Sequence, residues 1–146
     1  MKRLCAALAF AVAASFVAAG STPRPAGGVP HDPKTTPAYG VLALRKAAVE
    51  ADLADLSSKL TEDSRDVRAR RFELSAIGRE MERMRKVGRG DVPKLSNTYG
   101  ALILSKVALE VELDGLLSSF TPEYPEVKRK RVELAALERE LADILK

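Results

Sequence analysis

The sequence of 146 residues has one cysteine, one histidine and no tryptophan. Cys5 lies in the apolar run that follows Lys2 and Arg3, a pattern typical of an export signal. Once such a signal is removed, the chain contains no cysteine, which excludes disulfides, thiolate catalysis and cysteine-ligated metals. His31 stands among prolines with no evident catalytic partner, so we interpret it as a solvated loop residue.

Other signatures of chemistry are also missing. The sequence has no glycine-rich phosphate loop, zinc or calcium spacing, or nucleophile elbow. Its carboxylates are numerous but stand at helix-surface spacing beside Lys and Arg, where they are ordinary ion-pair partners. We therefore predict that the protein is not an enzyme and has no catalytic, cofactor-binding or metal-binding residues. With 24 basic and 20 acidic residues interspersed, the charge of +4 does not favour a nucleic-acid partner.

The N-terminal segment predicts export. Residues 1–20 combine a basic start, an apolar run from Leu4 to Val17, and small residues before a cleavage point near Ala19 or Gly20. The apolar run is shorter than the roughly 20 residues that span a bilayer. The expected location is periplasmic or secreted, and an uncleaved N-terminal membrane anchor is the alternative. Residues 21–35 are rich in Pro and Gly and predict a flexible tether.

The rest of the chain is an internal repeat. A shift of 60 residues superimposes 39–86 on 99–146 without a gap, and 19 of the 48 positions are identical, about 40%. Such identity indicates a duplication, so both copies are expected to have the same structure and role.

Each copy predicts two helices of about 25 residues. Thr36 and Ser96 are suitable N-caps for the first helices, and Thr61 and Thr121, the latter followed by Pro122, for the second. Acidic residues follow these threonines, as the helix dipole favours: Glu62, Asp63 and Asp66 in copy one, Glu123 and Glu126 in copy two. Copy one closes on a basic last turn and Gly88. The predicted units are repeat 1 at 36–86, a linker at 87–95 and repeat 2 at 96–146.

Apolar residues recur at steps of three and four in every predicted helix, the heptad pattern of a coiled coil. The first helices carry Leu42, Val49, Leu53, Leu56 and Leu60, repeated as Leu102, Leu109, Leu113, Leu116 and Phe120. The second helices carry Val67, Leu74, Ile77, Met81 and Met84, repeated as Val127, Leu134, Leu137, Leu141 and Ile144. The predicted fold is therefore all-α, two tandem antiparallel αα-hairpins.

Cations interrupt these seams at Lys46, Arg70, Lys106 and Lys130. If each hairpin folds about its threonine, Arg70 lies near Asp52 and Lys130 lies near the corresponding residue, Glu112. Such pairs would fix the register of the two helices. The alternative is that the long side chains extend to water beside the seam.

A single two-helix hairpin has too small a core to be stable alone. Each hairpin must bury its seam against the other hairpin or against another molecule, which predicts a homo-oligomer or a second helical envelope protein as partner. Apolar side chains outside the seam are available for this second surface: Val41, Leu44, Ile103, Leu104, Leu117 and Leu145.

Basic clusters mark the second predicted helix of each copy. They are Lys128, Arg129, Lys130 and Arg131 in copy two and Arg68, Arg70 and Arg71 in copy one. One interpretation is contact with an anionic polysaccharide or a lipid surface. The other is a solvated helix surface paired with neighbouring glutamates such as Glu126 and Glu133.

The break in copy two reads Phe120-Thr121-Pro122-Glu123-Tyr124-Pro125-Glu126-Val127. It resembles the helix-break-helix motif in the coiled coil of polysaccharide chain-length determinants (co-polymerases), which usually have Tyr where Phe120 stands. The break in copy one, residues 60–67, lacks both prolines. The resemblance implies an envelope-facing coiled coil that organises polysaccharide synthesis or export through oligomerisation. Members of that family are usually anchored by transmembrane helices at both ends.

Overall fold

The computed structural model describes residues 32–146, so the predicted signal at 1–20 and most of the predicted tether lie outside the described residues. The described part is entirely helical and has no strand, which confirms the all-α class. Four α-helices carry the fold: α1 Pro37–Lys59, α2 Arg65–Arg85, α3 Asn97–Leu117 and α4 Pro125–Ile144. They have 23, 21, 21 and 20 residues, so the expected length of about 25 is too long.

Two short 3-10 helices lie in the predicted tether and in the predicted linker. The first, η1 (Pro33–Thr35), takes up the end of the predicted tether and is capped by the Asp32 side chain, which accepts a hydrogen bond from the amide of Lys34. The second, η2 (Val92–Lys94), lies in the linker between the repeats. Both are therefore ordered extensions of the helical repeats.

The starts of α1 and α3 are those predicted from their caps. The Thr36 hydroxyl accepts a hydrogen bond from the amide of Tyr39 at 3.3 Å, and the Ser96 hydroxyl accepts one from Tyr99 at 3.2 Å. Pro37 occupies the first turn of α1, where a missing amide proton costs nothing. The repeated cap confirms this boundary in both copies.

The predicted starts of α2 and α4 are wrong by three residues, because the helices are preceded by Ser64 and Tyr124. Thr61 and Thr121 do not cap a helix; their carbonyls accept turn hydrogen bonds from the amides of Ser64 (3.0 Å) and Tyr124 (3.1 Å). Pro125 begins α4, because a proline holds the residue before it out of helical conformation, and Tyr124 has φ −56° and ψ 133°. Of the predicted acidic first-turn residues, Asp66 and Glu126 alone remain in a first turn.

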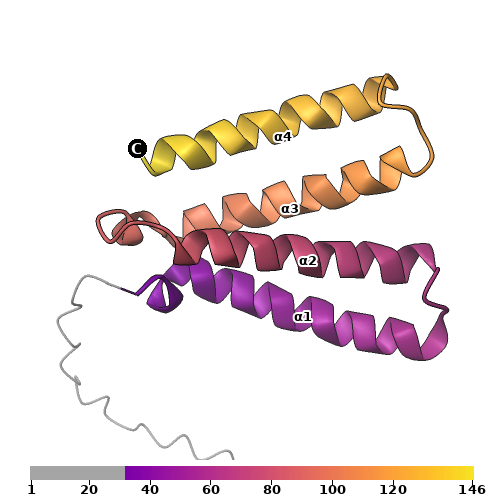
Figure 1. Cartoon of the computed structure of the whole chain (residues 1–146), viewed down its shortest axis with the longest axis horizontal. Coiled ribbons are helices and arrows are strands. Elements are labelled where there is room, and N and C mark those ends of the chain that lie inside the picture. The colour runs from indigo at the N-terminus through magenta and orange to yellow at the C-terminus, as the bar shows by residue number, and fades with distance from the viewer. Residues whose placement is uncertain (1–31) are drawn as a thin grey trace, which may run out of the picture.

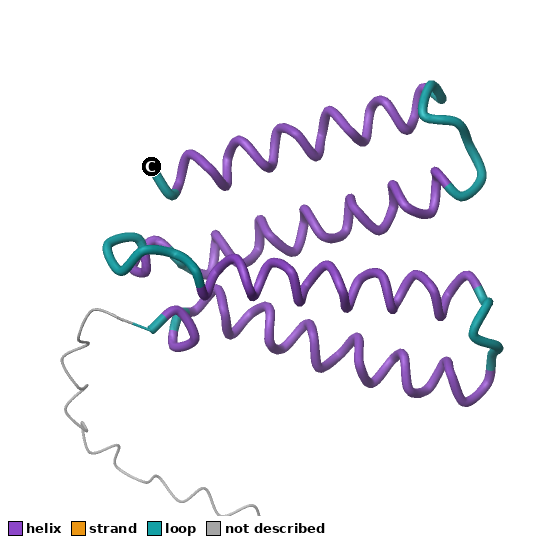
Figure 2. Tube along the Cα trace, in the orientation of Figure 1, coloured by secondary structure: helices purple, strands orange, loops and turns teal. Residues whose placement is uncertain are grey.

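The helices form an open arrangement that Figures 1 and 2 show from the same side. The chain runs along α1, reverses at residues 60–64 and returns beside it as α2; α3 and α4 repeat this path. The α3 helix packs against α1, α2 and α4, whereas the main packing of α4 is against α3. The two breaks lie at one end of the molecule, and the linker and the end of α4 lie at the other (Figure 1).

One apolar core joins the two hairpins. It includes Leu42 of α1, Ile77 of α2 and Ile103 and Val107 of α3, all buried. Residues 101–104, Ala-Leu-Ile-Leu, place apolar side chains on every side of α3, as a helix with three neighbours requires. This central position of α3 makes it the element on which the fold depends most.

The off-seam residues predicted to form a second surface divide into two groups. Ile103 is buried, and Val41, Leu104 and Leu145 are partly buried. The side chains of Leu44 and Leu117 are exposed instead, Leu44 by 75%. Contact between the hairpins therefore covers part of the expected surface and leaves apolar side chains uncovered.

Exposed apolar side chains lie at both breaks. Phe120 and Tyr124 stack with ring centroids 4.3 Å apart across the break of the second repeat. Tyr124 therefore packs across the turn. Among residues 32–146, no helix combines the length and apolar character that crossing a membrane requires.

Candidate functional site

Both ion pairs predicted from the hairpin register are present. Arg70 Nε lies 3.7 Å from Asp52 Oδ2, and Lys130 Nζ lies 2.7 Å from Glu112 Oε2. Hydrogen bonds to Glu112 and then to Glu133 raise the pKa of Lys130 above its ordinary value. These pairs tie α1 to α2 and α3 to α4 at equivalent positions.

The other two seam cations occupy different environments. Lys46 is 39% exposed and pairs with Glu50, four residues further along α1. The side chain of Lys106, its counterpart in the second repeat, is only 4% exposed. The same residue is therefore a surface cation in one repeat and a buried one in the other.

Lys106 lies where α3 meets α2. Its Nζ is 2.5 Å from Glu80 Oε1 of α2, 2.9 Å from Glu110 Oε1 of its own helix and 3.9 Å from Glu138 of α4. The Glu80 side chain is itself 7% exposed and also accepts a hydrogen bond from Arg83 at 2.7 Å. A buried charge is tolerable in such a place only because it is paired and hydrogen-bonded.

Two opposing effects set the pKa of Lys106. Burial acts to lower it, while hydrogen bonds and charge attraction from Glu80 and Glu110 act to raise it, and together they place the pKa above the ordinary lysine value. The amine therefore stays protonated at physiological pH. A protonated lysine is a hydrogen-bond donor and not a nucleophile, so its chemistry here is that of a structural tie.

A second charged contact completes this interface. Arg79 of α2 reaches Glu110 of α3, with Nη2 and Oε2 3.1 Å apart, and its guanidinium lies over the ring of Phe72. We call Arg79, Glu80, Lys106 and Glu110 the inter-hairpin cluster. It links the first repeat to the second through two ion pairs from two adjacent residues of α2.

Gly100 allows the first turns of α1 and α3 to approach closely. A Cβ at this position would stand 2.9 Å from the Cα of Ala38, too near for any real contact. Beside it, the amide of Ala38 donates to the carbonyl of Leu95 at 3.2 Å. The approach of the two backbones thus depends on the absence of a side chain at residue 100.

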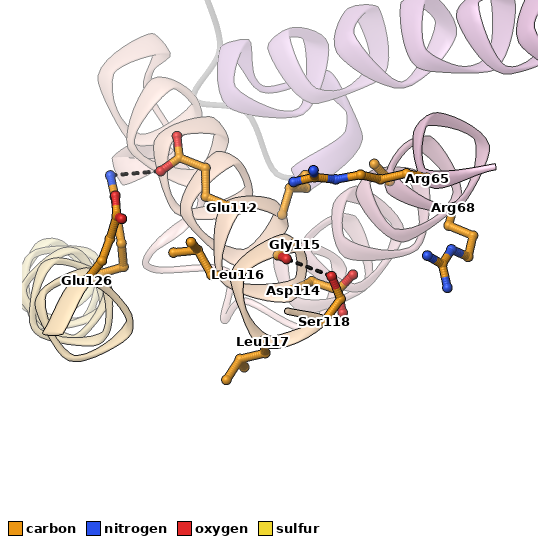
Figure 3. A pocket seen from close by; sticks show the side chains of 12 residues that line it. Arg65, Arg68, Glu112, Asp114, Gly115, Leu116, Leu117, Ser118 and Glu126 are labelled. Atoms are coloured by element: carbon orange, nitrogen blue, oxygen red, sulfur yellow. Dashed lines mark hydrogen bonds and ion pairs between the residues drawn. The ribbon is translucent and has the colours of Figure 1, made fainter. Parts of the chain in front are cut away.

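A groove of about 820 Å³ lies near the breaks, between the start of α2, the end of α3 and the start of α4 (Figure 3). Leu116 and Leu117 contribute apolar surface to it. Its charged residues are of both signs, Arg65, Arg68, Lys130, Glu112, Asp114 and Glu126. This mixture makes the groove a poor site for a simple anion.

The structure separates the seven predicted anion-contact residues into two groups. Arg70, Arg71, Arg129 and Lys130 pair with nearby carboxylates, Arg71 with Glu62 and Arg129 with Glu126 at 3.3 Å. Within residues 32–146, no carboxylate lies within ion-pair distance of Arg68, Lys128 and Arg131. The predicted basic surface is therefore largely neutralised by its own helices.

Comparison with protein-family models, with curated proteins and with solved structures finds no match. In the described part of the chain, no group of three His, Cys, Asp or Glu side chains is placed to hold a metal ion.

The interpretation of the sequence missed the inter-hairpin cluster. The sequence signal that could have revealed it is that the four charged residues of the cluster have identical counterparts in the other repeat.

Proposed function

We propose that this chain is a non-enzymatic, exported scaffold of the bacterial envelope, whose two tandem antiparallel hairpins mediate self-association or binding to a helical partner. The observation that carries the proposal is the unequal covering of equivalent helices. Seven residues are buried on α2 and two on α4, although the two sequences are repeats of each other. The α4 helix repeats the apolar pattern of α2 but buries far fewer of its residues, so it has apolar surface left for another molecule.

Exposed apolar side chains support the proposal. Val132 of α4 is 67% exposed, Leu44 of α1 is 75% exposed, and Phe120 and Tyr124 stand uncovered at the break. They are distributed over several elements, as expected for an assembly surface and unlike a single ligand pocket.

The envelope part of the proposal rests on the sequence. The N-terminal pattern supports export, and the break at residues 120–127 supports a role similar to that of the co-polymerase coiled coils. In that role the hairpins would organise polysaccharide synthesis or export by assembling, without touching the reacting sugars.

Light scattering combined with intact mass tests this function on the chain purified from the cells that produce it. We expect a mass that lacks the first 20 or so residues and a molar mass above that of one chain. Full-length chain in the cytoplasm would overturn export. A chain that stays monomeric at all concentrations and retains no envelope protein after crosslinking in cells would overturn the scaffold.

A second function is favoured by one observation: among residues 32–146, no carboxylate lies within ion-pair distance of Arg68, Lys128 and Arg131. They would bind an anionic polysaccharide or lipid headgroups. The test is sedimentation with vesicles of anionic and of neutral lipid, and with an acidic polysaccharide. Replacing the three cations by Gln should abolish binding, whereas Arg129→Gln, which removes a paired cation, should preserve most of it. Equal binding by both variants would reject this function.

A further inference from the structure

Each repeat has two faces that can take part in hairpin–hairpin contact, and each uses only one of them. The second repeat presents the leading face, formed on α3 by Gly100, Ile103, Lys106, Val107 and Glu110. The first repeat presents the receiving face, formed by Ala38, Ala76, Arg79 and Glu80. The 60-residue period assigns to each of these faces a counterpart in the other repeat.

The counterpart of the leading face lies on α1 and that of the receiving face on the second repeat. The former consists of Gly40, Ala43, Lys46, Ala47 and Glu50, and the latter of Thr98, Ala136, Arg139 and Glu140. All four residues of the second set are exposed, although Ala76 and Glu80 are buried in the first repeat. Nothing within residues 32–146 covers this second receiving face.

On the α1 face Ala43 packs partly against the core, while Gly40, Ala47 and Glu50 are exposed. The charges on this face and on the second receiving face are those of the inter-hairpin cluster. Lys46 and Glu50 repeat Lys106 and Glu110, while Arg139 and Glu140 repeat Arg79 and Glu80, without a single substitution. In the described chain, Lys46 and Glu50 pair with each other, and Arg139 donates to a carbonyl of its own helix at 3.2 Å. Glu140 has no ion pair among the described residues. One partner of each of two ion pairs thus lies on the α1 face, and the other partner lies on the second receiving face.

Gly40 is a second, independent observation. Gly100 is needed because another backbone lies against it, but a Cβ at Gly40 would meet no atom of residues 32–146 within 4 Å. Glycine in a helix is less favourable than alanine. An exposed helical glycine in open space, at the position where its counterpart packs against a neighbouring repeat, is explained if a further repeat packs there too.

We propose that a second copy of this chain docks the α1 face of its first repeat onto the receiving face of the second repeat, reproducing the contact inside the chain. Lys46 of one copy would pair with Glu140 of the next, and Glu50 with Arg139, while Gly40 would lie against Thr98. The inference rests on the proposed scaffold function and names its partner, a second copy in head-to-tail order. Because the two faces differ, the contact closes into a ring or extends as a chain of hairpins.

The contact between copies is weaker than the contact inside the chain. In the contact between copies, Ala43 and Ala47 stand where Ile103 and Val107 stand in the contact inside the chain. The contact between copies therefore buries less apolar surface. The contact inside the chain is also favoured by the linker, which holds the two repeats at high effective concentration. Assembly is therefore reversible and depends on protein concentration.

Charge reversal tests the proposal on the purified chain with its native N-terminus. Lys46→Glu alone places Glu opposite Glu140, and Glu140→Lys alone places Lys opposite Lys46, so each variant should assemble at least tenfold more weakly than the wild type. Mixing the two variants restores an opposite-charge pair at every contact, and so does the double variant Lys46→Glu/Glu140→Lys. Lys59→Glu, which reverses a surface lysine that also pairs with an acidic residue four positions away, is the control.

Light scattering distinguishes the outcomes. Weakening by each reversal, recovery in the mixture and normal assembly of the control support the proposal. If the wild type assembles and the reversals have no effect, the head-to-tail contact is rejected while the scaffold function stands. A wild-type chain that stays monomeric over the whole concentration range also rejects it, and leaves the scaffold function to a different partner.

Gly40→Ala provides a test that involves no charge. A Cβ at this residue would collide with the backbone of the next copy, so assembly should weaken while the circular dichroism and thermal unfolding of the dilute chain stay the same or improve. Unchanged assembly of this variant would overturn the proposed packing.

Discussion

At the scale of single residues, the duplication provides matched pairs in which the residue is constant and the environment differs. Lys46 and Lys106 differ in burial and in the number of carboxylates around them. A difference between their variants therefore measures the environment and not the residue type.

Replacing Lys106 by Met should cost about 3 kcal/mol of unfolding free energy, because it leaves Glu80 buried with only Arg83 as a partner. The same change at Lys46 should cost less than about 0.5 kcal/mol, since it removes an exposed pair within one helix. Urea unfolding of dilute chains measures both values. Equal losses would contradict the structural importance of the buried pair.

The same pair of variants has a pH signature. The folded state raises the pKa of Lys106, so its stabilising contribution is complete below the unfolded lysine pKa of about 10.4 and is lost as pH rises through the higher folded value. The stability difference between wild type and Lys106→Met should accordingly shrink in strong alkali and stay constant around neutral pH.

Two glycines form another matched pair. Gly100→Ala should destabilise the chain by about 1–3 kcal/mol, because the added methyl group meets the Ala38 backbone. Gly40→Ala should stabilise the isolated chain by about 0.5–1 kcal/mol, since the site is open and alanine favours helix. Chemical unfolding at low concentration checks both signs, and the same sign for both would contradict the close approach of α1 and α3.

At the scale of elements, the sequence was sufficient for the starts of α1 and α3 and insufficient for those of α2 and α4. At Thr36 and Ser96, a hydroxyl residue followed by a helix-forming run has one interpretation, an N-cap. At Thr61 and Thr121 it has two, because threonine also initiates turns, and the second break holds two prolines, either of which can begin a helix. The hydrogen bonds of the turn decide between them.

Capping predicts a difference between two threonines. Thr36→Ala should cost about 1 kcal/mol, because the buried hydroxyl caps α1 and also donates to the carbonyl of Pro33 at 2.6 Å. Thr61→Ala should change the unfolding free energy by less than about 0.5 kcal/mol, because an exposed Thr61 contributes its backbone carbonyl. Thermal unfolding of the two variants compares them directly, and a larger loss at Thr61 would restore the earlier helix start.

At the scale of the whole molecule, pattern reasoning predicted the ion pairs inside each hairpin, left open whether the second hairpin or another molecule covers the seam, and missed the ion pairs between the hairpins. Facing positions in a hairpin follow from chain reversal, which is why Asp52–Arg70 and Glu112–Lys130 could be expected. The heptad pattern describes the seam of each helix with its own partner. It does not say which of two equivalent lysines, 46 or 106, faces the neighbouring repeat, since that depends on which copy has a neighbour on that side.

Unequal packing predicts unequal local stability. The main packing of α4 is against α3, whereas α3 packs against three helices. Amide hydrogen exchange of the dilute chain should therefore be fastest in α4 and slowest in α3, because local opening requires fewer contacts to be broken. Uniform protection of the four helices would contradict an open arrangement, and protection of α4 that rises with concentration would follow from docking on it.

The position of the start of α1 and the end of α4 relative to the breaks also has a mechanical consequence. The start of α1 and the end of α4 lie at the same end of the molecule, opposite both breaks (Figure 1). A load applied between them pulls across the helix axes and peels α4 from α3 turn by turn, so few contacts resist at any moment. The buried Lys106–Glu80 pair joins α3 to α2, so this ion pair stays intact while α4 is pulled away from α3.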